Sequence, residues 1–101
     1  MKLVVIMSVD ACAEALERIY ADHHVPVFSE ADIRGFHRDS RVPIKENWFG
    51  NTRSPVYSKL TFAFLPAGKA DELLGAISAF NEENHPDSPI RAFLLNVEKS
   101  I

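Results

Sequence analysis

The sequence has few of the residues that build covalent frameworks or cofactor loops, with one cysteine, four glycines and one tryptophan among 101 residues. A single cysteine, Cys12, cannot form an intramolecular disulfide and lacks the spacing of a structural zinc site, so we expect it to be buried as a small apolar side chain. The scarcity of glycine also leaves the chain without a glycine-rich loop for cofactor phosphates.

Long apolar runs and excess positive charge are absent as well. Leu3–Met7 is too short to span a bilayer and is not followed by a small-residue cleavage site, so we expect a cytoplasmic protein that is neither secreted nor embedded in a membrane. The formal net charge of -3 does not favour binding to nucleic acid. A content of 47% apolar and 25% charged residues is ordinary for globular proteins, and the length predicts a single domain over residues 1–101.

Hydrophobic periodicity predicts four strands and two helices. In chain order these are a strand over 3–9, a helix from Asp10 to about His24, strands over 27–36 and 58–65, a helix from Lys69 to about Asn84, and a strand over 90–97. This βαββαβ order is typical of the ferredoxin-like fold. We therefore expect an α+β sandwich, in which a four-stranded antiparallel sheet carries both helices on one face.

Three of the predicted strands are apolar on both sides. The two alternating sets are Leu3, Val5 and Met7 with Val4 and Ile6; Leu60, Phe62 and Phe64 with Ala63 and Leu65; and Ile90, Ala92 and Leu94 with Phe93, Leu95 and Val97. Soluble monomers rarely expose a contiguous apolar patch of more than a few hundred Å². The pattern therefore predicts a homo-oligomer with the helix-free sheet faces turned inward.

Residues 38–57 join the second and third predicted strands and are too many for a passive connection in a small domain. Basic residues outnumber acidic ones in this segment, the basic ones being Arg38, Arg41, Lys45 and Arg53. Trp48 and Phe49 lie in its middle. Large aromatic side chains on such a segment either anchor a partner protein or fold back as a small cluster, and the sequence leaves both interpretations open.

The element order, the residues ADIRGFHR before the long segment and the residues IRAFLLNVEKSI after the second helix together resemble the P-II nitrogen-regulatory signal-transduction proteins and their P-II-like relatives. The resemblance covers nearly the whole chain. It implies a non-enzymatic, trimeric regulator that binds a small ligand in the cleft between subunits. The long segment would be the T-loop of that family, which docks on target proteins such as membrane transporters.

The resemblance also assigns residues to these roles. Gly35, Phe36, His37 and Arg38 would lie at the base of the T-loop, beside the intersubunit cleft. The residues expected to contact the target protein are Arg41, Lys45, Trp48, Phe49 and Arg53. The family holds nucleotide phosphates with a glycine-rich, basic segment before the last strand, whereas NEENHPDSPIR has no glycine and three acids. The cations left for an adenine nucleotide or a smaller anion are Arg38, Arg41 and Arg91.

Two other functions stay open. Some P-II-like relatives and the cation-tolerance proteins of similar fold are linked to heavy metals, and His37 is the candidate ligand for a divalent metal here. The chain has no HxxxH or HxH pair, so such a site would have to be assembled across subunits. Dimeric, cofactor-free oxygenases share the same element order. In a general enzyme interpretation Glu30, Asp32 and His37 would do acid–base work, but no nucleophile motif, metal triad or glycine-rich cofactor loop accompanies them.

Overall fold

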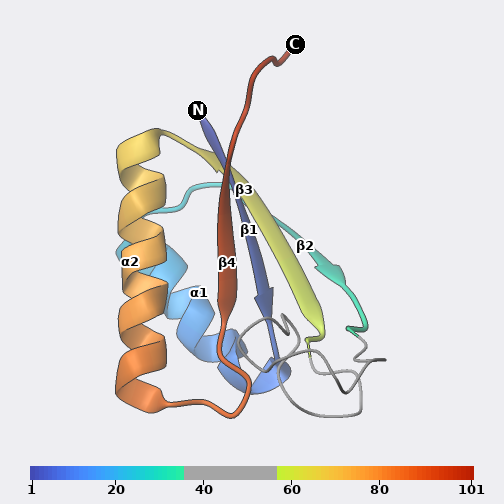
Figure 1. Cartoon of the computed structure of the whole chain (residues 1–101), viewed down its shortest axis with the longest axis vertical. Helices are drawn as coiled ribbons and strands as arrows, with labels where there is room; N and C mark the ends of the chain where they lie inside the picture. The colour runs from blue at the N-terminus through green and yellow to red at the C-terminus, as the bar shows by residue number, and fades with distance from the viewer. Residues whose placement is uncertain (36–56) are drawn as a thin grey trace, which may run out of the picture.

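The computed structural model describes residues 1–35 and 57–101. The elements are β1 (Lys2–Ser8), the short 3-10 helix η1 (Asp10–Cys12), α1 (Ala13–Asp22), β2 (Ser29–Asp32), β3 (Lys59–Leu65), α2 (Ala67–Asn84) and β4 (Arg91–Asn96). The strands form one antiparallel sheet in the order β2-β3-β1-β4 (Figure 1). This is the ferredoxin-like architecture that the sequence predicted.

Both helices pack on one face of the sheet, and the core lies between these two layers (Figure 1). Strand side chains alternate between the faces, so every second residue of β1 and β3 points toward the helices. The buried core side chains are Val4, Ile6, Ala63 and Leu65 from the strands, Leu16 and Tyr20 from α1, Ala70, Leu73 and Ile77 from α2, and Cys12, Val25 and Ile90 from the connections. Cys12 is buried, as predicted, and burial raises the pKa of its thiol.

The first helical region begins differently from the prediction. Asp10 does not cap the helix with its side chain; it opens a single 3-10 turn, and α1 starts only after Cys12. The Asp10 carboxylate instead accepts a hydrogen bond from the Ser58 hydroxyl at 2.9 Å. His23 and His24 end the helix, as expected, and His24 adopts a positive φ of 52°.

The second strand is much shorter than predicted. We expected it over 27–36, but β2 covers only Ser29–Asp32, and all four of its residues are exposed. An edge strand has only one neighbour, so pairing with β3 alone sets its length. Apolar and polar residues alternate imperfectly over 27–36 in the sequence, but the residues of β2 face solvent on both sides of the sheet.

The two chain ends lie at one end of the sheet, and residues 35 and 57 lie at the other (Figure 1). The segment after β4 continues away from the body toward the C-terminus. Among the helices of the described parts of the chain, none has the length and apolar character needed to cross a membrane.

Candidate functional site

The end of the sheet at residues 35 and 57 is the best-defined part of the candidate site. The N–H of Ile33 donates to the carbonyl oxygen of Ser58 at 2.8 Å, and the N–H of Gly35 donates to that of Tyr57 at 3.2 Å. These bonds continue the pairing of β2 with β3 beyond Asp32. The chain therefore leaves the sheet at Gly35 and returns to it at Tyr57, directly beside its point of departure.

Tyr57 connects this end of the sheet to the turn between α2 and β4. Its side chain is fully buried, and its hydroxyl donates a hydrogen bond to the carbonyl oxygen of Pro89 at 2.7 Å. Burial raises the pKa of the phenol, while the nearby Arg91 guanidinium partly offsets this by favouring the ionised form. Tyr57 is thus a neutral, packed side chain.

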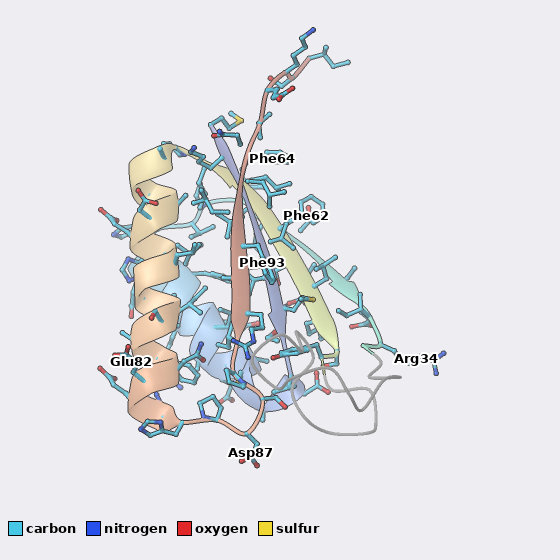
Figure 2. The ribbon with its side chains drawn as sticks, in the orientation of Figure 1. Arg34, Phe62, Phe64, Glu82, Asp87 and Phe93 are labelled. Atoms are coloured by element: carbon cyan, nitrogen blue, oxygen red, sulfur yellow. The ribbon has the colours of Figure 1, made fainter. Side chains whose placement is uncertain are left out.

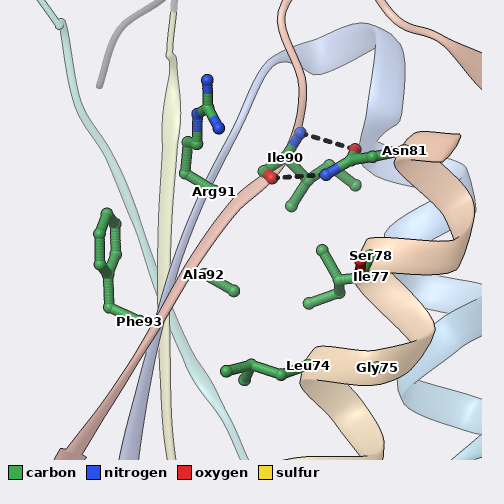
Figure 3. A pocket seen from close by; sticks show the side chains of 9 residues that line it. All are labelled: Leu74, Gly75, Ile77, Ser78, Asn81, Ile90, Arg91, Ala92 and Phe93. Atoms are coloured by element: carbon green, nitrogen blue, oxygen red, sulfur yellow. Dashed lines mark hydrogen bonds between the residues drawn. The ribbon is translucent and has the colours of Figure 1, made fainter. Parts of the chain in front are cut away.

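Arg91 opens β4 on the helix-free face, opposite Met7 of β1 (Figure 3). The side chain is partly buried, and its Nε has no hydrogen-bond partner among the described residues. A guanidinium keeps its charge at any physiological pH and presents several fixed N–H donors. Arg91 is therefore a permanent cation at the corner of the sheet nearest to Tyr57.

The structure brings together two of the predicted ligand-binding residues. Gly35 and Arg91 lie far apart in the sequence, and both contact or closely approach Tyr57. The remaining predicted residues lie outside the described parts of the chain: Phe36, His37, Arg38 and Arg41 for the ligand, His37 also for a metal, and Arg41, Lys45, Trp48, Phe49 and Arg53 for the target protein.

The helix-free face carries a continuous apolar surface next to this corner. The register aligns its side chains in three rows across β3, β1 and β4, namely Phe64, Leu3 and Leu95; Phe62, Val5 and Phe93; and Leu60, Met7 and Arg91. Phe62, Phe64 and Phe93 lie on the same side of the sheet, away from the helices (Figure 2). Phe62 is 38% exposed, Phe64 53% and Leu95 46%. We refer to these nine residues as the open face.

The other chemical groups of the described residues form no comparable site. No group of three or more His, Cys, Asp and Glu side chains in residues 1–35 and 57–101 is arranged to hold a metal ion. Glu30 and Asp32 are both exposed on β2, and Asp32 forms an ion pair with Lys59. The acid–base hypothesis for these two carboxylates therefore gains no support from their surroundings.

Comparison with known proteins supports the fold. No family model matches the sequence, and no curated protein matches it. Among the solved structures that match, the crystal structure of a DUF3240 family protein from Shewanella baltica OS155 superimposes with a TM-score of 0.66. The two chains are 16% identical, and the match covers 98% of this chain and 91% of the other. At this identity the likeness shows a shared ferredoxin-like architecture.

Sequence reasoning missed the part that Tyr57 and Ser58 play in building the site. The backbone N–H of Ser58 donates to the carbonyl oxygen of Ser8 at 3.0 Å, and its hydroxyl binds Asp10. Together with the Tyr57 hydroxyl, these bonds tie the start of β3 to the end of β1 and to the α2–β4 turn. A buried aromatic followed by a hydroxyl residue is a weak sequence signal, because the partners lie in remote parts of the chain.

Proposed function

We propose that this protein is a non-catalytic, P-II-like regulator that assembles as a homotrimer through its open faces. A small ligand would bind in the cleft between subunits, beside Gly35 and Arg91. Ligand binding would select one conformation of residues 38–57, which then act on a target protein such as a membrane transporter. A ligand shifts such an equilibrium only by its difference in affinity for the two states, so it must contact the base of that segment in one state only.

The position of Arg91 at the edge of the open face is the observation that carries this proposal. Eight of the nine residues of the open face are apolar, and Arg91 is the exception, at the corner next to Tyr57. If the apolar residues pack against another copy, Arg91 lies at the border of that interface. Fully burying a Leu, Val or Phe side chain is worth roughly 1.5–3 kcal/mol, so several such side chains offset the cost of association.

The turn between α2 and β4 favours a small anion over a nucleoside triphosphate such as ATP. Residues 85–90 contain Pro86 and Pro89, which have no backbone N–H, and the exposed carboxylate of Asp87. The carbonyl oxygen of Pro89 already accepts the bond from Tyr57. Phosphate groups need oriented N–H donors or cations, and Arg91, which directly follows this turn, places a guanidinium beside Tyr57. We therefore propose a ligand with a single anionic group as the first candidate.

The first experiment measures the assembly. Static light scattering after size exclusion should give the mass of a trimer for the wild type, and Phe64→Glu should give a monomer. Ala79→Glu is the matched control, because Ala79 is exposed on α2, on the opposite side of the sheet from the open face. A monomeric wild type at all concentrations would contradict the proposal, and a stable dimer would favour the oxygenase-like alternative.

The second experiment identifies the ligand class. Thermal unfolding would be followed with bicarbonate, inorganic phosphate, AMP, cyclic AMP, ADP and ATP, and with nickel, copper and zinc ions. We expect at least one anion to raise the melting temperature of the wild type and to have no effect on Arg91→Gln. Stabilisation by a metal ion that His37→Ala abolishes would instead support the heavy-metal function. If no compound changes the melting temperature, the sensing role is wrong.

A further inference from the structure

A groove of about 620 Å³ runs between helix α2 and strand β4, on the side of the sheet that carries the helices. Its α2 wall contains Leu74, Gly75, Ser78 and Asn81, and its floor includes Ile90 and Ala92 (Figure 3). The space around Gly75 is open, because a Cβ atom built on that residue meets no atom within 4 Å. The volume lies within the range of pockets that bind ligands in proteins, roughly 300–1,000 Å³.

The Asn81 side chain closes one end of this groove and makes the backbone hydrogen bonds that a neighbouring strand would make. The Asn81 amide donates to the carbonyl oxygen of Ile90 at 2.9 Å and accepts from its N–H at 3.0 Å (Figure 3). These are the two bonds that a residue on an added strand would make. The backbone groups of Ile90 therefore point toward α2 and away from β1.

The alternation of a β-strand then fixes the direction of the following backbone groups. The N–H of Val97 donates to the carbonyl oxygen of Met1, so the odd-numbered residues of β4 bond to β1. Ala92 and Leu94 share the parity of Ile90, so their N–H and C=O groups point away from β1 at the edge of the sheet, where Ala92 lines the groove. No residue in the described parts of the chain forms a hydrogen bond with these four groups.

The two edges of the sheet differ in how well they would accept an added strand. The β2 edge is four residues long, fully exposed and acidic at Glu30 and Asp32, and such features discourage strand addition. The β4 edge is six residues long, contains neither proline nor acid, and borders an apolar groove. Only β4 thus combines free ladder groups with a surface that would hold the side chains of an added strand.

We propose that the β4 edge binds an extended peptide segment of a partner protein, which pairs with Ala92 and Leu94 and lies against α2. Strand addition of this kind draws affinity from main-chain bonds and specificity from alternate side chains. Gly75 and Ser78 leave room for apolar side chains of the peptide in the groove. The groove adjoins the open face, because Arg91 and Phe93 also line it, but the outward backbone groups of β4 on which the proposal rests belong to the edge of the sheet.

The charges around the groove define the peptide further. Asp71 and Glu82 are exposed and lie on the same helical stripe as Gly75 and Ser78, four and seven residues from Gly75. Asp87 is exposed in the turn beyond Asn81 (Figure 2). Glu82 projects from the side of α2 away from β4 (Figure 2), so Asp71 and Asp87 are the carboxylates closest to the two ends of the groove along the chain. The peptide should have apolar residues at alternate positions in its centre and a Lys or Arg near each end.

A designed peptide of alternating valine and threonine, with a lysine at each end and a fluorescein label, tests this proposal on the full-length protein. We expect saturable binding by fluorescence polarisation at up to about 1 mM protein. The same peptide with terminal glutamates should bind at least tenfold more weakly, and Asp87→Lys should reduce binding of the lysine peptide. A lysine peptide that does not bind would overturn the proposal.

Two variants test the mode of binding. Ala92→Pro removes one outward N–H while leaving the bonds to β1 in place, and Gly75→Leu fills the groove from α2. Each should weaken binding at least tenfold, whereas Gly68→Leu, in the same helix and also in open space, should leave it within twofold. Unchanged binding in both Gly75→Leu and Ala92→Pro would refute the site. If either variant instead lowers the mass of the protein in solution, the edge pairs copies of this chain and the peptide proposal is wrong.

Discussion

At the scale of single residues, two buried tyrosines differ in how their hydroxyl groups are satisfied. The Tyr57 hydroxyl binds the Pro89 carbonyl oxygen, whereas the described residues offer no hydrogen-bond partner to the Tyr20 hydroxyl. Tyr57→Phe should therefore lower the free energy of unfolding by about 0.5–1.5 kcal/mol, and Tyr20→Phe should change it much less. Urea unfolding at one fixed protein concentration measures both. Equal losses in the two variants would contradict this assignment.

Tyr20 also predicts how stability changes in alkaline solution. Burial raises the pKa of Tyr20 to about 12, with a smaller opposing effect from Thr61, whereas an unfolded tyrosine ionises near pH 10. Between these values the unfolded state binds fewer protons, so the stabilisation is complete below pH 10 and is lost as the pH rises toward 12. From pH 9 to pH 11 the wild type should lose about 1 kcal/mol more than Tyr20→Phe. Urea unfolding at both pH values tests this difference, and equal losses would show that Tyr20 titrates normally in the folded state.

At the scale of elements, the sequence predicted the helices more accurately than the edge strands of the sheet. In the sequence Leu73, Leu74, Ile77 and Phe80 recur at the spacing of one helical face, and this pattern predicted the position of α2. A helix with one apolar face packs on a sheet through that face. The β2 prediction was too long because the pairing length of an edge strand depends on its neighbour. The groove beside β4 was not predictable either. It arises from the spacing of α2 and β4, and neither Gly75 nor Ser78 signals that spacing in the sequence.

The same helix provides a stability prediction. Gly75 lies in the interior of α2, is exposed, and has open space at its Cβ position. Gly75→Ala should raise the free energy of unfolding by about 0.5–1 kcal/mol, because alanine loses less conformational freedom in a helix. Gly68→Ala, near the start of the same helix, is the control and should have a smaller effect. The urea midpoint measures both changes, and a lower midpoint for Gly75→Ala would show that the groove tolerates no side chain there.

At the scale of the whole molecule, the sequence predicted an apolar helix-free face, and the structure leaves Phe62, Phe64 and Leu95 exposed there, while its packing against another copy stays a prediction. Gly35 and Arg91 were singled out from the sequence, and the fold places both beside Tyr57. Their meeting could not be read from spacing, because the hydroxyl bond from Tyr57 to Pro89 joins segments 32 residues apart.

An assembly through the open face has a thermodynamic consequence that a monomer lacks. If the folded chains associate and the unfolded chains do not, mass action makes the melting temperature rise with protein concentration. We therefore expect the wild type to melt at a higher temperature at high than at low concentration when followed by circular dichroism. Phe64→Glu should melt at the same temperature throughout, because a carboxylate in the row of Phe64, Leu3 and Leu95 would be buried without a partner. Ala79→Glu, on the exposed side of α2, should retain the dependence of the wild type. A wild-type melting temperature independent of concentration would mean that the open face stays in water, and Arg91 would then border no cleft.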